Sequence, residues 1–515
     1  MGVGGRHALL DRAIAHRRRD LRRRRAGPGA APPGRGADPR LALHPRAPRA
    51  PRIRPDRRPR DLRCRRADDA RGARTARPRA PALLERARES AGAGVTAVLD
   101  LVLRSCRLPS GAELVDVAIA GGRIVAVGPA SGPARETIDV AGRLVTPGLV
   151  EAHIHLDKAL LADRVDGSAE TAAEAIRLTG LAKRAFTVDD IDARARRVLD
   201  LAVGAGTTAM RAHVEVDPIV GLAGMEAMLR LRREYAPAVD LQLCAFAQEG
   251  ILQAPGTEAL LRRALAMGAD LVGGCPYNDT DARRHVEIVF ALASEFGVDA
   301  DFHVDFSDEP EHLHVREIVR QTVRTGWQGR VAMGHLTELA ALPPAEQAAV
   351  IAELAAAGIG VISLPLTDLY LMGRRDERNV RRGLTPIRRL LAAGVPVALA
   401  SNNIRNPFTP VGTADLTHLT FVSAVAAHMG TPELLRDLVA AVTTHPARIL
   451  NLRDYGCATG CRADLVVWEC ERVEEIVTAL PPRRLVVKAG RVTIEHERRT
   501  VERWRSGESS GSRGG

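Results

Sequence analysis

The sequence predicts an α/β protein: a (β/α)8 TIM barrel, with a small β-sandwich domain built from both ends of the ordered chain. Apolar, strand-like runs alternate with amphipathic helical stretches between residues 149 and 451. Polar residues stand where the runs end, and β-rich segments flank the alternating region on both sides. Eight such repeats fit a closed barrel better than an open sheet. Glycine-rich phosphate loops are absent from the sequence, so a nucleotide-binding fold is not supported.

The barrel is predicted over residues 149–451, with helical stretches such as residues 256–267 between its strands. Each predicted strand is a short apolar run of the kind that is buried in a parallel sheet. The eight runs are residues 149–153, 207–213, 240–246, 271–274, 299–303, 331–335, 359–364 and 397–401.

The small β domain is predicted over residues 95–148 and 452–500. Two β-rich runs surround Gly121 and Gly122, which is typical of a hairpin. Because similar runs occur near both ends, we expect the two ends to share one small sheet domain. The Ser/Gly-rich tail over residues 501–515 is expected to be flexible. The predicted strands of this domain are residues 101–103, 115–119, 123–127, 144–146, 464–468 and 484–492.

The basic character of the chain, whose formal net charge is +12, lies in residues 1–94. This segment holds 27 Arg, no Lys and 9 acidic residues, so the remainder is mildly acidic. It contains too few apolar residues to offset chain entropy and is predicted to be disordered. It could be a nucleic-acid arm, a transit peptide, or the translation of a GC-rich stretch upstream of a true start at Val95. We favour the last, because such arms usually mix Lys with Arg and the segment is too long and too poor in Ser for a transit peptide.

The remaining composition points to a cytoplasmic protein with a small-molecule substrate. No apolar run reaches the roughly 18 residues of a transmembrane helix, and no signal peptide is apparent. We therefore expect neither a membrane nor a nucleic-acid partner, and a homo-oligomer is left open. Cys457 and Cys461 are the only close pair among 7 cysteines, and their spacing suits neither a zinc knuckle nor a redox motif.

Histidines mark the predicted carboxyl ends of several strands, which is where barrel enzymes place their chemistry. His153 and His155 alternate at the first strand end, so both side chains point to the same side. Together with His303 they would form a three-histidine face with an open position, suited to one divalent metal ion, Zn²⁺ or Fe²⁺. A lone strand histidine is more often structural, but His-x-His followed by His303 and His335 favours a metal site. We interpret the other histidines as structural: His285, His312, His314, His418, His428 and His445.

Five segments in order resemble the bacterial cytosine deaminase branch of the amidohydrolase superfamily, over about residues 97–495. The resemblance implies a (β/α)8 metallohydrolase in which His153, His155 and His303 hold the metal. It also implies that Gln248 binds the amide edge of a cyclic substrate and that His335 orients the attacking water. Phe408 stands where the deaminases stack a Trp near the substrate. The segments are VTPGLVEAHIHLD (145–157), AFAQEGIL (245–252), PLTDLYLMGR (365–374), NPFTPVGTAD (406–415) and NLRDYG (451–456).

Three positions depart from that family. The Asp that ligates metal and accepts the proton of water falls on Asn402, and the Asp after it falls on Asn403, which we expect to bind substrate. The proton-donating Glu falls on Phe306. A neutral amide can ligate weakly but is no base near neutral pH. Lys158, which follows the first strand, is either a surface lysine or supplies charge in the barrel mouth.

Other polar residues remain close to these positions: Asp305, Asp308 and Glu309. We expect a metal-dependent hydrolase of the C–N bond of a small nitrogen heterocycle or cyclic amide, with His335, Lys158 and Asn402 as catalytic candidates. Two rivals are an amidohydrolase with another acid/base set, such as one that removes an N-alkyl group, and a non-catalytic binding protein. The substitutions at Asn402 and Phe306 favour the binding protein, whereas the intact histidine set argues against it.

We predict that a chain beginning at Val95 folds and stays soluble as well as the full chain, because nothing in residues 1–94 is expected to pack. The measurement is the Tm of the two proteins. A loss of several degrees on removal of residues 1–94 would show that the segment is structural.

Overall fold

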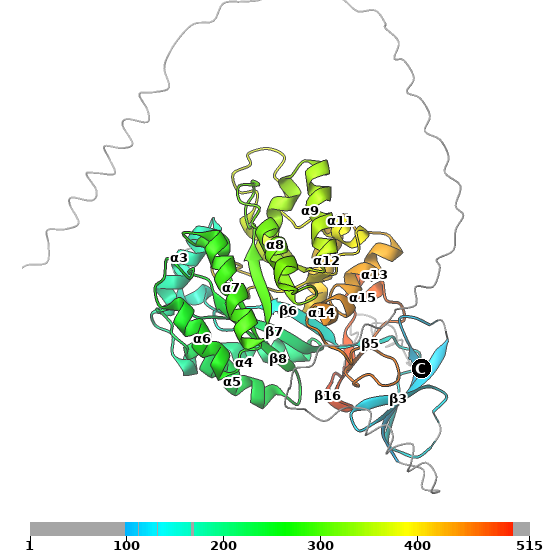
Figure 1. Ribbon diagram of the computed structural model, residues 1–515. Coiled ribbons are helices and arrows are strands. Elements are labelled where there is room, and N and C mark those ends of the chain that lie inside the picture. The colour runs from blue at the N-terminus through cyan, green and yellow to red at the C-terminus, as the bar shows by residue number, and fades with distance from the viewer. Residues whose placement is uncertain (1–97, 112, 131, 166–168, 498–515) are drawn as a thin grey trace, which may run out of the picture. The chain divides into compact units, whose positions relative to one another are not determined.

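The computed structural model describes residues 98–111, 113–130, 132–165 and 169–497 (Figure 1). These residues all belong to one of the two units into which the chain divides. The predictions for residues 1–94 and 501–515 lie outside the described residues.

The central element is an eight-stranded sheet in which every neighbouring pair is parallel and the strands follow one another in chain order. Figure 1 shows β6, β7 and β8 with helices around them. The eight predicted strands are confirmed. They are β6 (Leu149–Ile154), β7 (Thr207–Glu215), β8 (Asp240–Ala247), β9 (Leu271–Gly274), β10 (Asp299–Val304), β11 (Val331–His335), β12 (Gly360–Ser363) and β13 (Val397–Leu399).

The sheet closes between its first strand and the residues after its last strand. Ile154 and Asn402 form a parallel bridge. The Asn402 N–H donates to the His153 carbonyl and the His155 N–H donates to the Asn402 carbonyl, both at 2.8 Å. Closure makes the predicted (β/α)8 TIM barrel the observed fold.

The buried Glu151 carboxylate binds backbone on both sides of the same seam. It accepts the backbone N–H groups of His153 and Ser401 at 3.1 Å. Burial raises the pKa of Glu151 to about 7, although these N–H groups oppose the shift.

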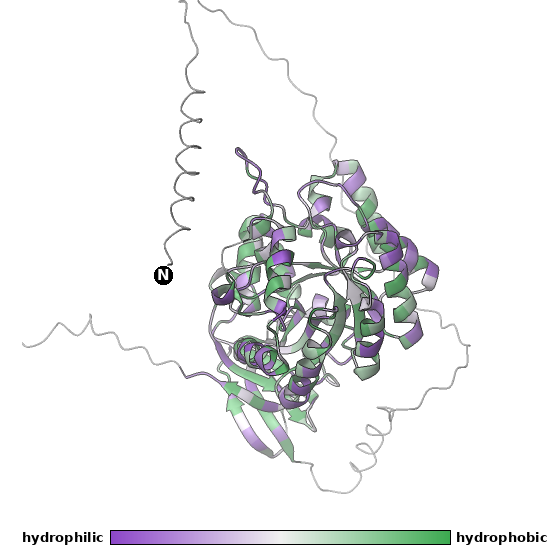
Figure 2. Cartoon of the chain, turned by 90° about the vertical axis from the view of Figure 1, so that its left-hand side faces the viewer, coloured by the Kyte–Doolittle hydropathy of each residue, from purple (hydrophilic) through white to green (hydrophobic). Residues whose placement is uncertain are grey.

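Amphipathic helices cover the barrel, and Figure 2 shows hydrophilic and hydrophobic residues alternating along them. The predicted helix over residues 256–267 is α6, which begins after Gly256 and ends before Gly268, both in the left-handed region. The long helices around the barrel are α3 (Ala172–Lys183), α4 (Val188–Gly204), α5 (Ala223–Tyr235), α6 (Thr257–Met267), α7 (Ala282–Phe296), α8 (Val315–Thr325) and α9 (Pro344–Ala356).

Except for α12, the later helices are shorter, and three 3-10 helices lie in the loops of the described chain. These helices are α10 (Pro365–Leu371), α11 (Ile387–Ala392), α12 (Leu416–Ala426), α13 (Pro432–Ala440), α14 (Thr444–Ile449) and α15 (Glu475–Thr478). The 3-10 helices are η2 (Ala162–Arg164), η3 (Pro276–Asn278) and η4 (Thr337–Ala341).

Two four-stranded sheets flank the barrel and enclose a separate apolar core that includes Leu103, Ile119, Leu465 and Val487. The first has the order β3-β2-β1-β4, and the second, β16-β15-β14-β5, joins strands from both ends of the described chain. Their strands are β1 (Leu99–Arg107), β2 (Leu114–Ala120), β3 (Arg123–Gly128), β4 (Ala134–Asp139), β5 (Val145–Pro147), β14 (Leu465–Trp468), β15 (Arg483–Lys488) and β16 (Arg491–Glu495).

The hairpin of β2 and β3 turns at Gly121 and Gly122, whose φ angles of 57° and 75° are those of a turn with two left-handed residues. Only glycine takes two such positions in a row without strain. The sequence missed β4, whose polar residues carry little strand signal.

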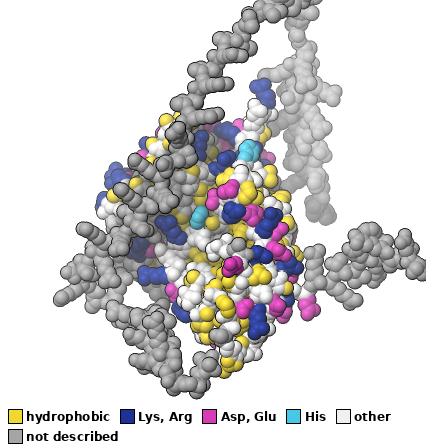
Figure 3. Space-filling model, turned by 90° about the vertical axis from the view of Figure 1, so that its right-hand side faces the viewer, with side chains coloured by type: hydrophobic (Ala, Val, Ile, Leu, Met, Phe, Trp, Pro, Cys, Tyr) yellow, Lys and Arg dark blue, Asp and Glu magenta, His cyan; other side chains and the backbone are white. Residues whose placement is uncertain are grey.

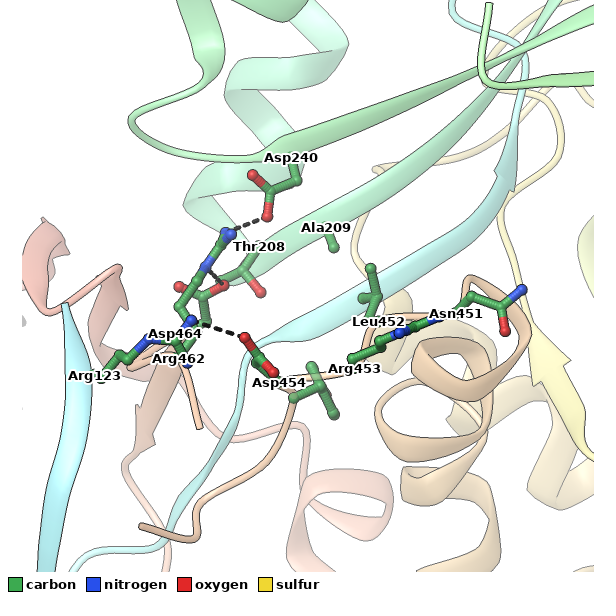
Figure 4. A pocket seen from close by; sticks show the side chains of 11 residues that line it. Arg123, Thr208, Ala209, Asp240, Asn451, Leu452, Arg453, Asp454, Arg462 and Asp464 are labelled. Carbon is green, nitrogen blue, oxygen red and sulfur yellow. Dashed lines mark hydrogen bonds and ion pairs between the residues drawn. The ribbon is translucent and has the colours of Figure 1, made fainter. Parts of the chain in front are cut away.

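Ion pairs join the small sheets to the amino-terminal end of the barrel around a cavity of about 290 Å³ (Figure 4). Arg462 pairs with Asp240 of β8 and with Asp464, and Arg123 pairs with Asp454. The buried Lys488 ammonium donates to the Thr208 carbonyl at 2.7 Å, and also to Asp240 and Asp464.

Charges of both signs are interspersed on the face that Figure 3 shows. Among the described residues, no helix is both long and apolar enough to cross a membrane.

Candidate active site

The carboxyl ends of the barrel strands bring the predicted histidines together. His153 lies on β6, His155 directly follows it, and His303 lies on β10. The Nε2 atom of His303 is 3.0 Å from Nε2 of His153 and 3.0 Å from Nε2 of His155. All three side chains are buried, and their Nδ1 atoms have no hydrogen-bond partner among the described residues.

The protonation state of these rings suits metal binding. Burial, reinforced by the neighbouring rings and Lys158, holds the pKa of His153 and His155 well below the usual range. Burial and the surrounding histidines do the same to the pKa of His303. A neutral imidazole is the form that ligates Zn²⁺ or Fe²⁺. Three neutral rings whose Nε2 atoms converge therefore fit a divalent ion.

The sequence did not single out His213 of β7 as a ligand candidate. Nitrogen atoms of His153, His213 and His303 lie within 4.8 Å of one another. The His213 ring stacks on His153 with centroids 3.8 Å apart, and its Nε2 atom is 3.4 Å from the Asp301 carboxylate. Two histidine triples thus share His153 and His303. Only its position at a strand end could have indicated His213 from the sequence.

Asn402 lies beside this cluster at the barrel seam. Its backbone φ is 56°, in the left-handed region, which Asn and Asp adopt more readily than most residues. Its side-chain Oδ1 atom is buried without a hydrogen-bond partner among the described residues. The side chain of Asn403 is used within the loop, where its Oδ1 atom accepts the Asn406 amide at 2.7 Å.

His335, at the end of β11, is held by Asp368 of α10. The His335 Nδ1 atom is 2.7 Å from the Asp368 carboxylate, and the Thr385 hydroxyl donates to the His335 carbonyl at 2.6 Å. A carboxylate on Nδ1 fixes the ring with Nε2 free to accept a proton. Burial raises the pKa of Asp368. Sequence reasoning missed Asp368, although it stands in one of the five resembling segments.

Phe306 stacks on the His335 ring, with centroids 3.9 Å apart and planes at 28°. It belongs to an apolar cluster over the barrel mouth to which Phe408 also contributes. The other members include Ala169, Ala175, Ile176, Leu178, Leu371 and Met372.

Lys158 is buried, with 1% of its side chain exposed, so the structure excludes the surface alternative. Its ammonium group donates to Glu215 Oε1 at 2.6 Å and to Gln248 Oε1 at 3.1 Å. It also lies 4.3 Å from the ring centroid of Phe408. The Gln248 amide nitrogen lies 3.4 Å from Cys275 Sγ. The structure thus brings Lys158, Gln248 and Phe408 together.

An acidic group of Glu215, Asp217 and Glu249 has the spacing of a second metal site. The Lys183 ammonium already lies 2.6 to 2.8 Å from one oxygen of each. Burial alone would raise the pKa of Glu215, but Lys158 and Lys183 lower it to about 2. The Lys183 ammonium therefore occupies the position that a metal ion would take between these carboxylates.

The three acidic residues close in sequence to Phe306, which are Asp305, Asp308 and Glu309, bind other groups of the protein. The Asp305 carboxylate accepts the N–H groups of His314 and Val315 at the start of α8. Asp308 accepts the Gly373 N–H, and Glu309 pairs with Arg381. None of the three has the arrangement of a replacement for the missing acid.

Several of the remaining histidines have structural partners. His285 pairs with Asp279 at 2.8 Å, and His312 pairs with Glu338 at 3.1 Å. The His445 Nδ1 atom lies 3.2 Å from the Val397 carbonyl.

A closed barrel with histidines gathered at the carboxyl ends of its strands defines the class of metal-dependent barrel hydrolases. Residues 136–494 match the Amidohydrolase family Amidohydro_3. The chain belongs to the amidohydrolase family. It is a metal-dependent hydrolase acting on carbon–nitrogen bonds other than peptide bonds.

Individual relatives agree with this family. The chain is 28% identical over 407 residues to the N-isopropylammelide isopropyl amidohydrolase of Pseudomonas sp. (strain ADP), a match over 77% of this chain and 98% of the relative. It is 30% identical over 384 residues to the pterin deaminase of Rhizobium rhizogenes (strain K84), over 73% of this chain and 87% of the relative.

A solved structure shares the whole fold. The 5-methylcytosine deaminase from Klebsiella pneumoniae liganded with 5-fluorocytosine has a TM-score of 0.75 and 29% identity, covering 78% of this chain and 99% of the other. The resemblance to the cytosine deaminase-like branch is confirmed.

The loop that carries Gln248 depends on one carboxylate. Asp279 accepts the N–H groups of Ile251, Leu252 and Gln253 and lies 2.8 Å from His285 Nδ1. Burial alone would raise the pKa of Asp279. These hydrogen bonds outweigh burial and hold the pKa of Asp279 below its usual value of 3.8. The ionised form therefore stabilises the fold above that pH, and this contribution is lost as the pH falls through the lowered pKa.

We predict that Asp279→Asn lowers the free energy of unfolding at pH 7 by about 1–3 kcal/mol, because a buried charged acceptor is lost. The difference from wild type should shrink as the pH falls below about 4, the ordinary range of Asp. Denaturant unfolding across pH measures both, with exposed Asp163→Asn as the control. A difference independent of pH would contradict this role of the charge.

Proposed function

We propose that this amidohydrolase acts on a C–N bond of a small nitrogen heterocycle or cyclic amide, using one Zn²⁺ or Fe²⁺ ion held by His153, His155 and His303. The observation that carries the proposal is the approach of two Nε2 atoms to the Nε2 atom of His303 at 3.0 Å. The names of the relatives support it, since they include a pterin deaminase and a 5-methylcytosine deaminase.

His155 is preferred to His213 as the third ligand. The Nε2 atom of His155 is 3.0 Å from the same nitrogen of His303 that His153 approaches. His213 instead lies stacked on His153 with planes at 26°, and its Nε2 atom is 3.4 Å from Asp301. A ring stacked on a ligand and beside a carboxylate is better suited to holding that ligand in place.

The chemistry divides between the ion and the protein. A bound divalent ion supplies Lewis acidity at the histidine cluster. His335 is the proton acceptor for the attacking water, because Asp368 holds Nδ1 and leaves Nε2 available. Gln248 binds the amide edge of the substrate, and the apolar cluster around Phe306 and Phe408 excludes bulk water.

Cytosine deamination is not the activity we propose. Asn402 cannot accept a proton near neutral pH, and Phe306 cannot donate one. Removal of an N-alkyl group from a ring is the second candidate, since one relative is named an N-isopropylammelide isopropyl amidohydrolase. Metal analysis and a screen against ring amines, ring amides and N-alkylated rings separate these activities from a binding protein.

We predict that His153→Ala and His303→Ala each abolish stoichiometric metal, because two imidazoles leave a weak, open site. His155→Ala should do the same, whereas His213→Ala should retain metal. Metal content per folded chain is the measurement, with His445→Ala, remote from the cluster, as the control. Retention of one metal by all three ligand variants would place the ligands elsewhere.

We predict that Asn402→Asp combined with Phe306→Glu gains cytosine deamination, because the two changes restore a proton acceptor and a proton donor. General acid–base groups each contribute about 10²–10⁴-fold. Ammonia release from cytosine is the measurement, and the two single variants are the controls, because each restores only one of the two groups.

Wild-type deamination of cytosine at ordinary rates of about 1–10³ per second would contradict the importance of these residues. A double variant that binds metal but remains inert would mean that the pocket is adapted to another substrate.

A further inference from the structure

We propose that Lys158 binds an anionic oxygen of the substrate, so that the preferred substrates are oxo-heterocycles that carry a negative charge at neutral pH. This inference rests on the proposed function and names the chemical class that the same site accepts. Lys158 is a buried cation beside Gln248, the residue expected to bind the substrate.

One N–H bond of the Lys158 ammonium has no acceptor among the described residues. The group has three N–H bonds, and its acceptors there are Glu215 Oε1 at 2.6 Å and Gln248 Oε1 at 3.1 Å. The ring of Phe408, with its centroid 4.3 Å away, covers another side of the group. A buried donor without an acceptor is costly, so a substrate oxygen that completes the set is favoured.

The counter-ion of Lys158 is shared. Glu215 gives its Oε1 atom to Lys158, while its Oε2 atom lies 2.6 Å from Lys183. Lys183 also pairs with Asp217 and Glu249, so Glu215 is the one carboxylate among the described residues that the Lys158 ammonium contacts. A substrate oxygen that accepts the remaining N–H bond of Lys158 is bound most strongly when it carries negative charge, because the donor is an ammonium group.

Gln248 is oriented by the same contact. Its Oε1 atom accepts from Lys158, and its amide nitrogen lies 3.4 Å from Cys275 Sγ. Gln248 and Lys158 therefore both present N–H donors rather than a free acceptor. Two donors side by side select oxygen over a ring amine.

The residues expected to hold the metal also carry no negative charge. Asn402, an uncharged residue, lies at the barrel seam next to His153 and His155, where the resemblance implies an anionic ligand in the family. An ion held by His153, His155 and His303 would therefore lack a carboxylate ligand and its compensating negative charge. An anionic substrate supplies it, which a neutral aminopyrimidine does not.

The test measures binding, by calorimetry with metal-loaded protein at neutral pH, so it does not depend on turnover. The probes are barbiturate, an oxo-pyrimidine anion, and 2-aminopyrimidine, a neutral ring without oxygen. Lys158→Met should weaken barbiturate binding at least about tenfold, the loss typical of a hydrogen bond to a charged group. It should change 2-aminopyrimidine binding by less than about threefold, well under that loss.

Controls separate recognition from folding. Lys158→Arg should restore much of the barbiturate binding, because it keeps the charge. Lys488→Met removes another buried lysine at the opposite end of the barrel and should not alter the ratio of the two affinities. Lys183 still pairs with Glu215 in Lys158→Met, so no carboxylate is left alone; if that variant does not fold, Lys158→Gln takes its place.

Equal weakening of both probes, or unchanged barbiturate binding, overturns the proposal. If Lys158→Met selectively loses barbiturate binding but the wild type hydrolyses no heterocycle, Lys158 is an anion-binding residue and the proposed function fails. If the wild type hydrolyses a heterocycle but Lys158→Met shows no selective loss of barbiturate binding, the proposed function stands and the role of Lys158 is wrong.

Discussion

The site depends on the hydrogen bonds that close the barrel between β6 and the residues after β13. His153 and Asn402 are distant in the chain, yet the Asn402 N–H donates to the His153 carbonyl and the Asn402 carbonyl accepts from His155. Glu151 binds both sides of this seam through the N–H groups of His153 and Ser401. Because the same backbone that closes the barrel carries His153 and His155, closure fixes the position of Asn402 next to them in the seam. The position of His303 then follows from the parallel register of β10.

Charge at the barrel mouth is organised in two parts that share Glu215. On one side, Lys183 satisfies three carboxylates that would otherwise repel one another, which excludes a second metal from that group. On the other side, Lys158 and the neutral histidines face the barrel mouth with donors and few acceptors. Asn402 and Phe306 add no charge to the barrel mouth, so the Lys158 ammonium, paired with Glu215, is the charged group that contacts Gln248.

The barrel could be predicted because its strands are continuous apolar runs, and His153, His155 and His303 because a period of two and the strand ends place them on one side. Pairings between residues that are distant in sequence could not be predicted. Whether Lys158 was exposed or buried depended on Glu215 and Gln248, which are far away in sequence, and Asp368 could be matched to His335 only once α10 was placed. His213 had the same strand-end signal as the ligands, but its stacking on His153 is a consequence of packing. The polar strand β4 carried too weak a pattern to be recognised.

The residues at 402 and 306 differ in what the fold requires of them. At 402 the backbone is held in the left-handed region by the closure bonds, a conformation that Asn and Asp both tolerate, so the carboxylate can be lost or regained with little effect on folding. At 306 the ring packs on His335 and within the apolar cluster, with 6% of the residue exposed. A carboxylate there would be buried among apolar side chains, at a cost in stability unless it were protonated or paired. Phe306 is thus embedded in the packing of the mouth, and its aromatic contact keeps the His335 ring in place. The change at 402 alters chemistry alone, whereas the change at 306 alters both the chemistry and the shape of the site.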